Sequence, residues 1–483
     1  MTNRRYGFII CKWYIEFKNK YARILNFMKK SAFFMTAVLV GAGLCCAAGN
    51  VELERNVIKP FAAWKSDVPV ADVPGKNKPE DVKRKRQAHI DALKKFAPYF
   101  LDEYAFIDKA FNLKSGTYCD IAVFGRKKPA AAAPAPHECT SWVVMPDLTG
   151  GKSLIVHKNR DSSSKKLIAQ QRAVKGKRAW IGMGNFGGLG TNMGINDKAL
   201  VVVMNSGDRT GANNDAGIGT TVMARIMLEN CSTAAEAVKM LDRMIAEKVY
   251  THGKSGSIWF IADKDNAFIA EHNAETIAVK GVHSGFGIRA NSWDFPEMIP
   301  YSHATPNDIV GNNRREYAVR DLLFKKHQVI GKVVTPEMMA EASRIKEFPE
   351  DKKCYPLCGK LTNSAATFVI DQEFPEELSY AGMSFGCPAY TLYLPVPLML
   401  DEFPAELLDG RNPNAAMVRW EKKKPLMSDD KVIEFEGKLN ARHRKALAAA
   451  RKILRKDRNR KLAAQLLNDA FRENCKEFLK ATE

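Results

Sequence analysis

The spacing of hydrophobic and polar residues predicts a domain of strands and helices in the middle of the chain. Short apolar runs bounded by turn residues are typical of strands, whereas apolar residues recurring every three or four positions are typical of helices. Strand-like runs lie at 141–145, 153–156, 201–205, 257–263, 267–271, 276–279, 365–371, 382–386 and 391–395. An inserted helical layer accompanies these strands. The mixture predicts an α+β domain over residues 139–400.

Helical spacing dominates on both sides of this domain. Charged and apolar residues alternate between 78 and 109 in the manner of one or two amphipathic helices. An Ala/Pro-rich stretch then predicts an unstructured tether, so we interpret residues 49–138 as a pro-segment. Beyond residue 400, arginines and lysines accompany an apolar stripe between 442 and 467. This pattern predicts a basic helix within a C-terminal extension, 401–483.

The N-terminal residues predict export. Residues 28–48 combine a short basic start, an apolar run and small residues, which is the order of a secretory signal peptide cleaved near Ala48. Residues 1–27 then precede the true start. A lipid-modified Cys45 or Cys46 fits less well, because the position before either cysteine lacks the small residue that such sites use. We therefore predict a periplasmic or secreted protein.

One cysteine stands where cleavage of the chain would make it a catalytic N-terminus. Cys139 directly follows the tether, and a cut before it would place a thiol and an α-amine on the same residue. The thiolate is a nucleophile, and an α-amine with an ordinary pKa near ~8 can accept and return a proton. The glycine pair 150–151 predicts a hairpin whose strands bring Asp161 back to Cys139. The alternative interpretation is an ordinary buried thiol.

Four blocks of sequence occur in a fixed order between Cys139 and Pro397. They are Cys139-Thr140 with Asn159 and Asp161, then Gly194–Asn205, Ile218–Leu241 and Gly287–Ser292. In this order and spacing they resemble the cysteine N-terminal-nucleophile hydrolases. That group contains choloylglycine (bile salt) hydrolases, penicillin V acylases and the penicillin-forming acyltransferases.

The resemblance implies a fold and a set of roles. The fold is a four-layer αββα sandwich of two mostly antiparallel sheets. The implied catalytic residues are Cys139, Asp161, Asn205, Asn291 and Arg314. Asn205 would stabilise the oxyanion that forms when an amide carbonyl is attacked, and Asn291 would bind either the amine of the nucleophile or the same oxygen. An arginine beside the thiolate would favour its charged form; Arg314 matches best, with Arg315 directly behind it.

One departure leaves the branch of the group open. Bile salt hydrolases have an arginine where this chain has Lys158, and lysine lacks the planar fork of a guanidinium. We predict hydrolysis of a linear amide C–N bond through an acyl-thioester on Cys139, after autoproteolysis of the 138–139 bond. Acylase, amidase, acyltransferase and dipeptidase activities all remain open. The competing interpretation is a non-catalytic envelope protein that binds through its basic C-terminal helix.

Composition changes this picture little. The 483 residues are 46% hydrophobic, enough for a large core, and the net charge is +20. In an exported protein this charge favours contact with an anionic envelope surface over nucleic acid. Nine histidines show no ligand spacing to the cysteines, so we predict no metal and no cofactor. Cys354 and Cys358 either form a disulfide or remain thiols. The substrate is expected to be a small-molecule amide, and a homo-oligomer remains open.

Overall fold

The computed structural model describes residues 79–125, 139–162, 167–185, 187–348, 356–359, 361–408, 419, 422 and 424–482. All described residues belong to one compact unit. The expected signal peptide and the tether before Cys139 lie outside the described residues. Within the described ranges, no helix is both long enough and apolar enough to cross a membrane.

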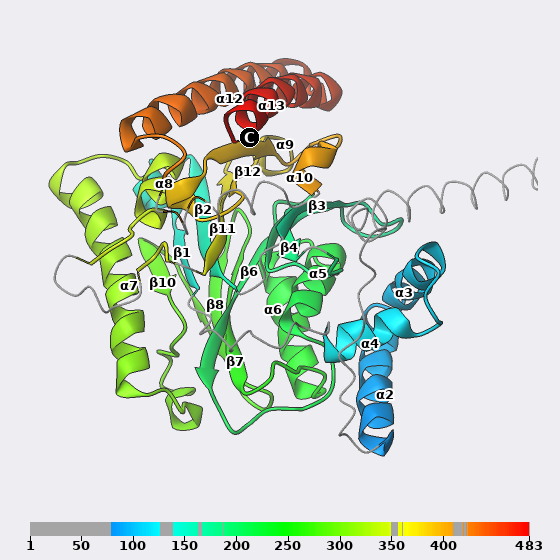
Figure 1. The fold of residues 1–483 in the computed structure, drawn as a ribbon. Helices are drawn as coiled ribbons and strands as arrows, with labels where there is room; N and C mark the ends of the chain where they lie inside the picture. The colour runs from blue at the N-terminus through cyan, green and yellow to red at the C-terminus, as the bar shows by residue number, and fades with distance from the viewer. Residues whose placement is uncertain are drawn as a thin grey trace, which may run out of the picture. The chain divides into compact units, whose positions relative to one another are not determined.

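Two antiparallel sheets form the centre of the domain (Figure 1). The six-stranded sheet has the order β10 (Phe286–Arg289), β1 (Thr140–Val144), β2 (Ser153–Asp161), β11 (Thr362–Asp371), β12 (Tyr380–Ser384) and β13 (Tyr393–Pro397). The seven-stranded sheet has the order β3 (Leu167–Arg172), β4 (Trp180–Asn185), β5 (Met193–Asn196), β6 (Val201–Arg209), β7 (Ser255–Ala262), β8 (Ala267–His272) and β9 (Ile277–Gly281). The six-stranded sheet joins strands from distant parts of the sequence, whereas the strands of the seven-stranded sheet follow one another in chain order.

Helices cover the outer faces of both sheets (Figure 1). The seven-stranded sheet packs against α5 (Thr220–Asn230) and α6 (Ala234–Ala246), and the six-stranded sheet against α7 (Pro306–Phe324) and α8 (Pro336–Ser343). Short helices are α9 (Pro375–Leu378), α10 (Ala405–Leu408) and a π-helical turn at Lys325–Val329. The main apolar core lies between the sheets, where alternate strand residues point inward. The predicted α+β class and αββα layering are therefore confirmed.

The β1–β2 hairpin carries the residues of interest. Gly150 and Gly151 have φ values of 68° and 73°, the left-handed conformation that glycine adopts without strain. In the register of the hairpin, Ser141 lies opposite Lys158. Since side chains alternate between the faces of a strand, residues two apart on β1 and β2 share the face toward the other sheet. This face contains the candidate site.

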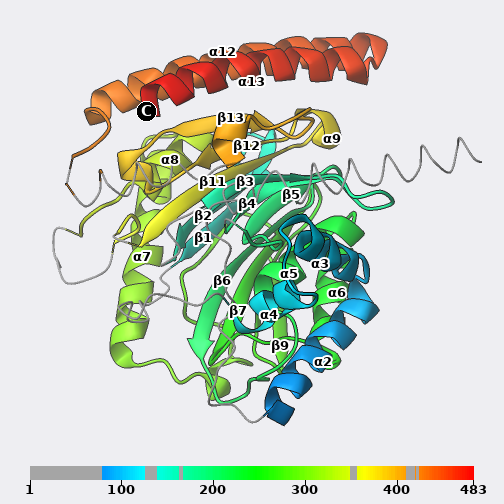
Figure 2. The ribbon, with the colours of Figure 1, turned by 45° about the vertical axis from the view of Figure 1, so that its right-hand side comes forward.

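The N-terminal region forms two helices in the range where the sequence predicted one or two, and a third helix follows beyond it. They are α2 (Pro79–Phe96), α3 (Tyr99–Ala110) and α4 (Thr117–Phe124). Figure 2 shows them beside α5 and α6. Buried polar contacts join the two groups of helices, including Glu103 with Arg225 and His89 with the carbonyl oxygen of Gly217. Residues 79–125 are thus packed on the domain.

The predicted basic C-terminal helix is a pair of antiparallel helices, α12 (Asp429–Asp457) and α13 (Arg460–Thr482). The helix ends because Arg458 adopts a left-handed φ of 51°, a break that the hydrophobic pattern does not reveal. The pair packs on β13, and Phe471 and Phe478 enter the main core. Several arginines of the pair bind acidic residues of the domain, as Arg451 binds Asp371. Much of the predicted basic surface is therefore neutralised within the chain.

The described disulfide differs from the pair that the spacing suggested. Cys358 bonds Cys387, and 29 positions separate them. Cys354 lies outside the described residues. Cys387 begins the loop before β13, so the bond joins the segment before β11 to the segment after β12. A partner so far along the chain cannot be found from local cysteine spacing.

Candidate active site

Cys139 lies between the two sheets at the start of β1. Its side chain is 6% exposed, and its Sγ atom is 3.8 Å from the backbone oxygen of Asp161. The carboxylate of Asp161 is also buried, at 2% exposure for the residue. The structure therefore brings together the two residues that the hairpin pattern placed side by side.

Arg315, rather than Arg314, contacts the cysteine. The guanidinium of Arg315 is buried and donates to the backbone oxygen of Cys139 at 3.0 Å and to Thr140 Oγ1 at 3.2 Å. It also donates to Asn291 Oδ1 at 3.3 and 3.4 Å. Arg314 is only half-buried. The preference for Arg314 is thus corrected to its neighbour, because consecutive helical residues point about 100° apart.

Lys158 is a site residue that the sequence reasoning recorded only as a departure. Its side chain is completely buried, and Nζ donates to the backbone oxygen of Met204 and to Asn205 Oδ1, each at 2.6 Å. Nζ also forms a hydrogen bond with the Cys139 side chain. Burial lowers the pKa of Lys158, and the nearby cysteine opposes that effect. The sequence signal that could have placed Lys158 in the site was its position opposite Ser141 in the hairpin.

Both polar atoms of the Asn205 side chain already have hydrogen-bond partners in this structure. Its Nδ2 donates to the backbone oxygens of Arg289 at 3.2 Å and Ala290 at 2.9 Å. Its Oδ1 accepts from Lys158 and, at 2.8 Å, from Ser141 Oγ. The expected role of Asn205 as a side-chain oxyanion donor stays a prediction; in this structure Asn205 links β6 to the end of β10 and accepts a hydrogen bond from Lys158.

Asn291 lies across the site, directly beyond β10. Its Nδ2 donates to the backbone oxygen of Ser206 at 2.7 Å, and no second acceptor for this nitrogen lies among the described residues. Its Oδ1 accepts from Arg315. Nearby, burial raises the pKa of Glu316 to about 7, although the N–H of Ala290 donates to its carboxylate at 2.8 Å. Of the two predicted asparagines, Asn291 has the amide hydrogen that an incoming oxyanion needs.

Comparison with known proteins agrees with this arrangement. Residues 148–309 match the model of the acyl-coenzyme A:6-aminopenicillanic acid acyl-transferase family, over about a third of the chain. The match begins after Cys139 and includes Lys158, Asp161, Asn205 and Asn291. The resemblance to the N-terminal-nucleophile hydrolases is confirmed.

Solved structures of such hydrolases resemble the chain only distantly. An N-acylethanolamine-hydrolyzing acid amidase ortholog from Caenorhabditis elegans is 17% identical; the match covers 49% of this chain and 94% of that one, with a TM-score of 0.33. Two variants of conjugated bile acid hydrolase from Clostridium perfringens are 13% identical, cover 54% of this chain and 92% of theirs, and have TM-scores of 0.35 and 0.36. No curated protein sequence matches the chain.

Basic side chains surround Cys139. Lys158, Arg160 and Arg315 are buried near Cys139, with Asp161 as a nearby acid. Burial lowers the pKa of Arg160 to about 10, while Cys139 and Asp161 act in the opposite direction, so this guanidinium remains charged at neutral pH.

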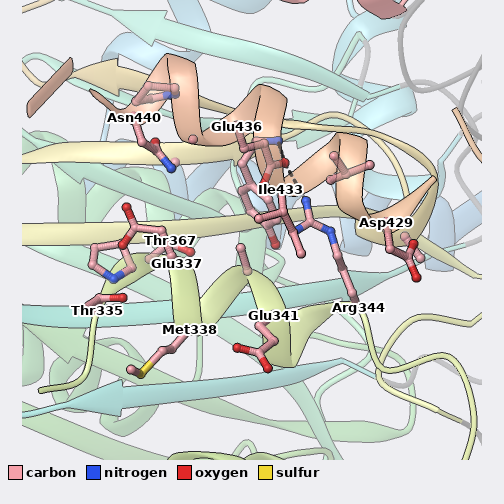
Figure 3. Close-up of a pocket in the computed structure, with 18 of the residues that line it drawn as sticks. Thr335, Glu337, Met338, Glu341, Arg344, Thr367, Asp429, Ile433, Glu436 and Asn440 are labelled. Carbon is pink, nitrogen blue, oxygen red and sulfur yellow. Dashed lines mark hydrogen bonds and ion pairs between the residues drawn. The ribbon is translucent and has the colours of Figure 1, made fainter. Parts of the chain in front are cut away.

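A separate cavity of about 560 Å³ lies on the other face of the six-stranded sheet. It is bounded by Met338 of α8, Thr367 and Tyr393 of the sheet, and Ile433 of α12. Figure 3 shows Arg344 pointing toward Glu436 inside it, and the two side chains form a partly buried ion pair. Cys139 does not line this cavity. The cavity is therefore separate from the candidate site around Cys139.

Substitutions at Arg314 and Arg315 test which of the two arginines acts at the site. Replacing Arg315 by methionine removes the cation that holds the backbone of Cys139, so turnover is expected to fall by about a hundredfold or more. The matched change Arg314→Met is expected to stay within about threefold of wild type, because surface substitutions away from the site have small effects. Steady-state rates of both variants show which of the two arginines contributes to turnover. Equal losses would contradict the assignment to Arg315.

Proposed function

We propose that the chain is an exported amidase that cuts a linear amide C–N bond through an acyl-thioester on Cys139. The observation that carries this proposal is the convergence of Cys139, Lys158, Arg315 and Asp161 in the buried site between the sheets. The match to an acyltransferase family model supports the same acyl chemistry. The nucleophile becomes competent when the bond between residues 138 and 139 is cut and the α-amine is released.

The proposed reaction follows from the positions of these groups. The thiolate attacks the substrate carbonyl, and the negative charge that develops on its oxygen is stabilised by the amide of Asn291. The α-amine of Cys139, held by the buried carboxylate of Asp161, carries the thiol proton to the leaving nitrogen. Water then attacks the thioester, releases the acid and restores the thiol. The guanidinium of Arg315 holds the backbone of Cys139 throughout.

Acyl transfer is the second candidate function. The matched family is described as an acyl-transferase, and a thioester on Cys139 can pass its acyl group to an amine as well as to water. Product analysis with and without an added amine acceptor such as 6-aminopenicillanic acid separates the two. New amide formation would support transfer, whereas free acid alone would support hydrolysis.

The test begins with the N-terminus of the purified protein. Edman sequencing is expected to start at Cys139, and intact mass analysis is expected to show a cut 138–139 bond. The processed protein is then incubated with N-acylethanolamines, conjugated bile acids, penicillin V, N-acyl homoserine lactones and dipeptides, with the liberated amine as readout. Hydrolysis of any class by chains that begin at Cys139 supports the proposal. An uncut bond together with no released amine would favour the envelope-binding alternative.

A further inference from the structure

The uncleaved chain lacks the base that the mature enzyme would use. Until the 138–139 bond is cut, the nitrogen of Cys139 belongs to a peptide bond and cannot accept a proton. Some other group must therefore take the thiol proton if the cysteine is to cut its own bond. This question rests on the proposed function, since it arises only if Cys139 performs that cleavage.

The groups around the sulfur leave few candidates for this role. Arg160 and Arg315 are guanidinium groups, which stay protonated near neutral pH and cannot accept a proton. The atom of Asp161 that contacts Cys139 Sγ is its backbone oxygen, not its carboxylate. The ring of His157 lies on the other face of β2, where it bonds Thr367 Oγ1 at 2.7 Å. Lys158 is the remaining basic group.

The contacts of Lys158 fit a neutral amine. A neutral amine has two N–H donors and one lone pair, and two acceptors meet its nitrogen at 2.6 Å: the backbone oxygen of Met204 and Asn205 Oδ1. The Cys139 side chain is a third polar neighbour of Nζ, so the lone pair of a neutral amine can accept the thiol proton. Complete burial favours the uncharged form, because an ammonium loses its hydration there.

Asn205 and Ser141 hold this arrangement in place. Asn205 is fixed by two bonds from its Nδ2 to backbone oxygens, so its Oδ1 has a defined position. That oxygen accepts from Ser141 Oγ at 2.8 Å as well as from Lys158. An arginine in place of Lys158 would keep a positive charge but could not exchange a proton. Lys158, at the position where bile salt hydrolases have arginine, can thus exchange a proton that an arginine could not.

We propose that Lys158 is the base that accepts the Cys139 thiol proton in the uncleaved chain. The thiolate attacks the carbonyl carbon of Glu138 and forms the C–S bond. The C–N bond to Cys139 then breaks, and the proton on Lys158 moves to the departing nitrogen, which becomes the free α-amine. Water adds its hydroxyl to the thioester carbon and its hydrogen to the sulfur, so that Glu138 ends as a carboxylic acid and Cys139 as a thiol. From that point the α-amine serves as the base.

The experiment measures cleavage of newly made full-length chains by cell-free translation, with gel and intact mass analysis at timed intervals. Lys158→Arg keeps the charge and removes the base, so the cleavage rate is expected to fall at least about a hundredfold. Lys158→Ala is expected to fall similarly and to recover in part when methylamine or ethylamine is added as a substitute base. Lys152→Arg is the matched control, because Lys152 is exposed on the hairpin, and it should cleave like wild type.

Folding of the variants is checked by releasing Cys139 with an added protease, which does not require Lys158. Replacing residues 135–138 by the Ile-Glu-Gly-Arg sequence lets factor Xa release Cys139 in both wild type and Lys158→Arg. Amide hydrolysis by the released variant is expected to fall by a smaller factor than self-cleavage does. Wild-type cleavage rates in Lys158→Arg, or slow Lys158→Ala cleavage that no amine restores, would overturn the role of Lys158 alone. Absence of cleavage in the wild type would instead overturn the proposed function.

Discussion

Replacing Cys139 by alanine is expected to abolish both cleavage of the 138–139 bond and amide hydrolysis. Alanine supplies neither a nucleophile nor a site for a thioester, so turnover should fall by at least about a thousandfold, the scale seen when an enzyme loses its nucleophile. Cys139→Ser keeps a weaker nucleophile in the same place and should cleave slowly. Intact mass and released amine, measured on the same preparation, report the two reactions separately.

A second buried cysteine provides the matched control. Cys231 is a free thiol with 1% exposure at the end of α5, and Cys231→Ala is expected to retain cleavage and turnover. A Cys139→Ala protein that still released amine at the wild-type rate would remove the cysteine from the mechanism. If Cys231→Ala lost activity equally, the loss would reflect damage to the fold rather than to the chemistry.

Replacing Glu103 by glutamine is expected to destabilise the protein by about 3–5 kcal/mol. Glu103 of α3 binds Arg225 of α5 with two hydrogen bonds of 2.6 Å, and both side chains are almost completely buried. Arg172 approaches the same carboxylate at 3.9 Å. Removing the acid leaves two buried guanidinium groups without this partner. Denaturation of the uncleaved Cys139→Ala protein, in which the chain stays in one piece, measures the effect.

The control for Glu103→Gln is an exposed ion pair that also joins the N-terminal helices to the domain. Lys95 of α2 binds Glu247 after α6, and the lysine side chain is 50% exposed. Lys95→Gln should therefore cost about 0–1 kcal/mol. In the cleaved protein, we expect the segment carrying Glu103 to remain bound during gel filtration and the Glu103→Gln segment to separate more readily. Equal stability of the two variants would contradict the importance of the buried pair.

The pH dependence of this contact has a defined sign. Burial acts to raise the pKa of Glu103, but the charges and hydrogen bonds of Arg225, with Arg172, lower it overall. The pair therefore contributes stability above the ordinary glutamate pKa, and this contribution is lost as the pH falls through the lowered folded value. Acidification should release the N-terminal helices more easily than neutral conditions do, and Glu103→Gln should reduce that pH dependence.

The helix that carries Arg315 shows why part of the site could not be predicted. The buried face of α7 contains Asn312 and Arg315 together with apolar residues, whereas Tyr317 and Phe324 are 66% and 52% exposed. Hydrophobic spacing assumes the opposite distribution and so gives the wrong rotation for this helix. The polar residues are buried because they meet Cys139 and Asn291. These polar contacts and the packing of Val319 and Leu323 together fix which face of α7 turns inward.

The sequence by itself determined the α+β class, the β1–β2 hairpin and the closeness of Asp161 to Cys139, because these depend on strand periodicity and on one glycine turn. Only the tertiary structure decided that Arg315 reaches the cysteine, that Lys158 points at it, that Asn205 donates to backbone carbonyls, and that Cys387 is the partner of Cys358. These contacts join segments far apart in the chain. Their geometry depends on how sheets and helices pack, which local patterns do not specify.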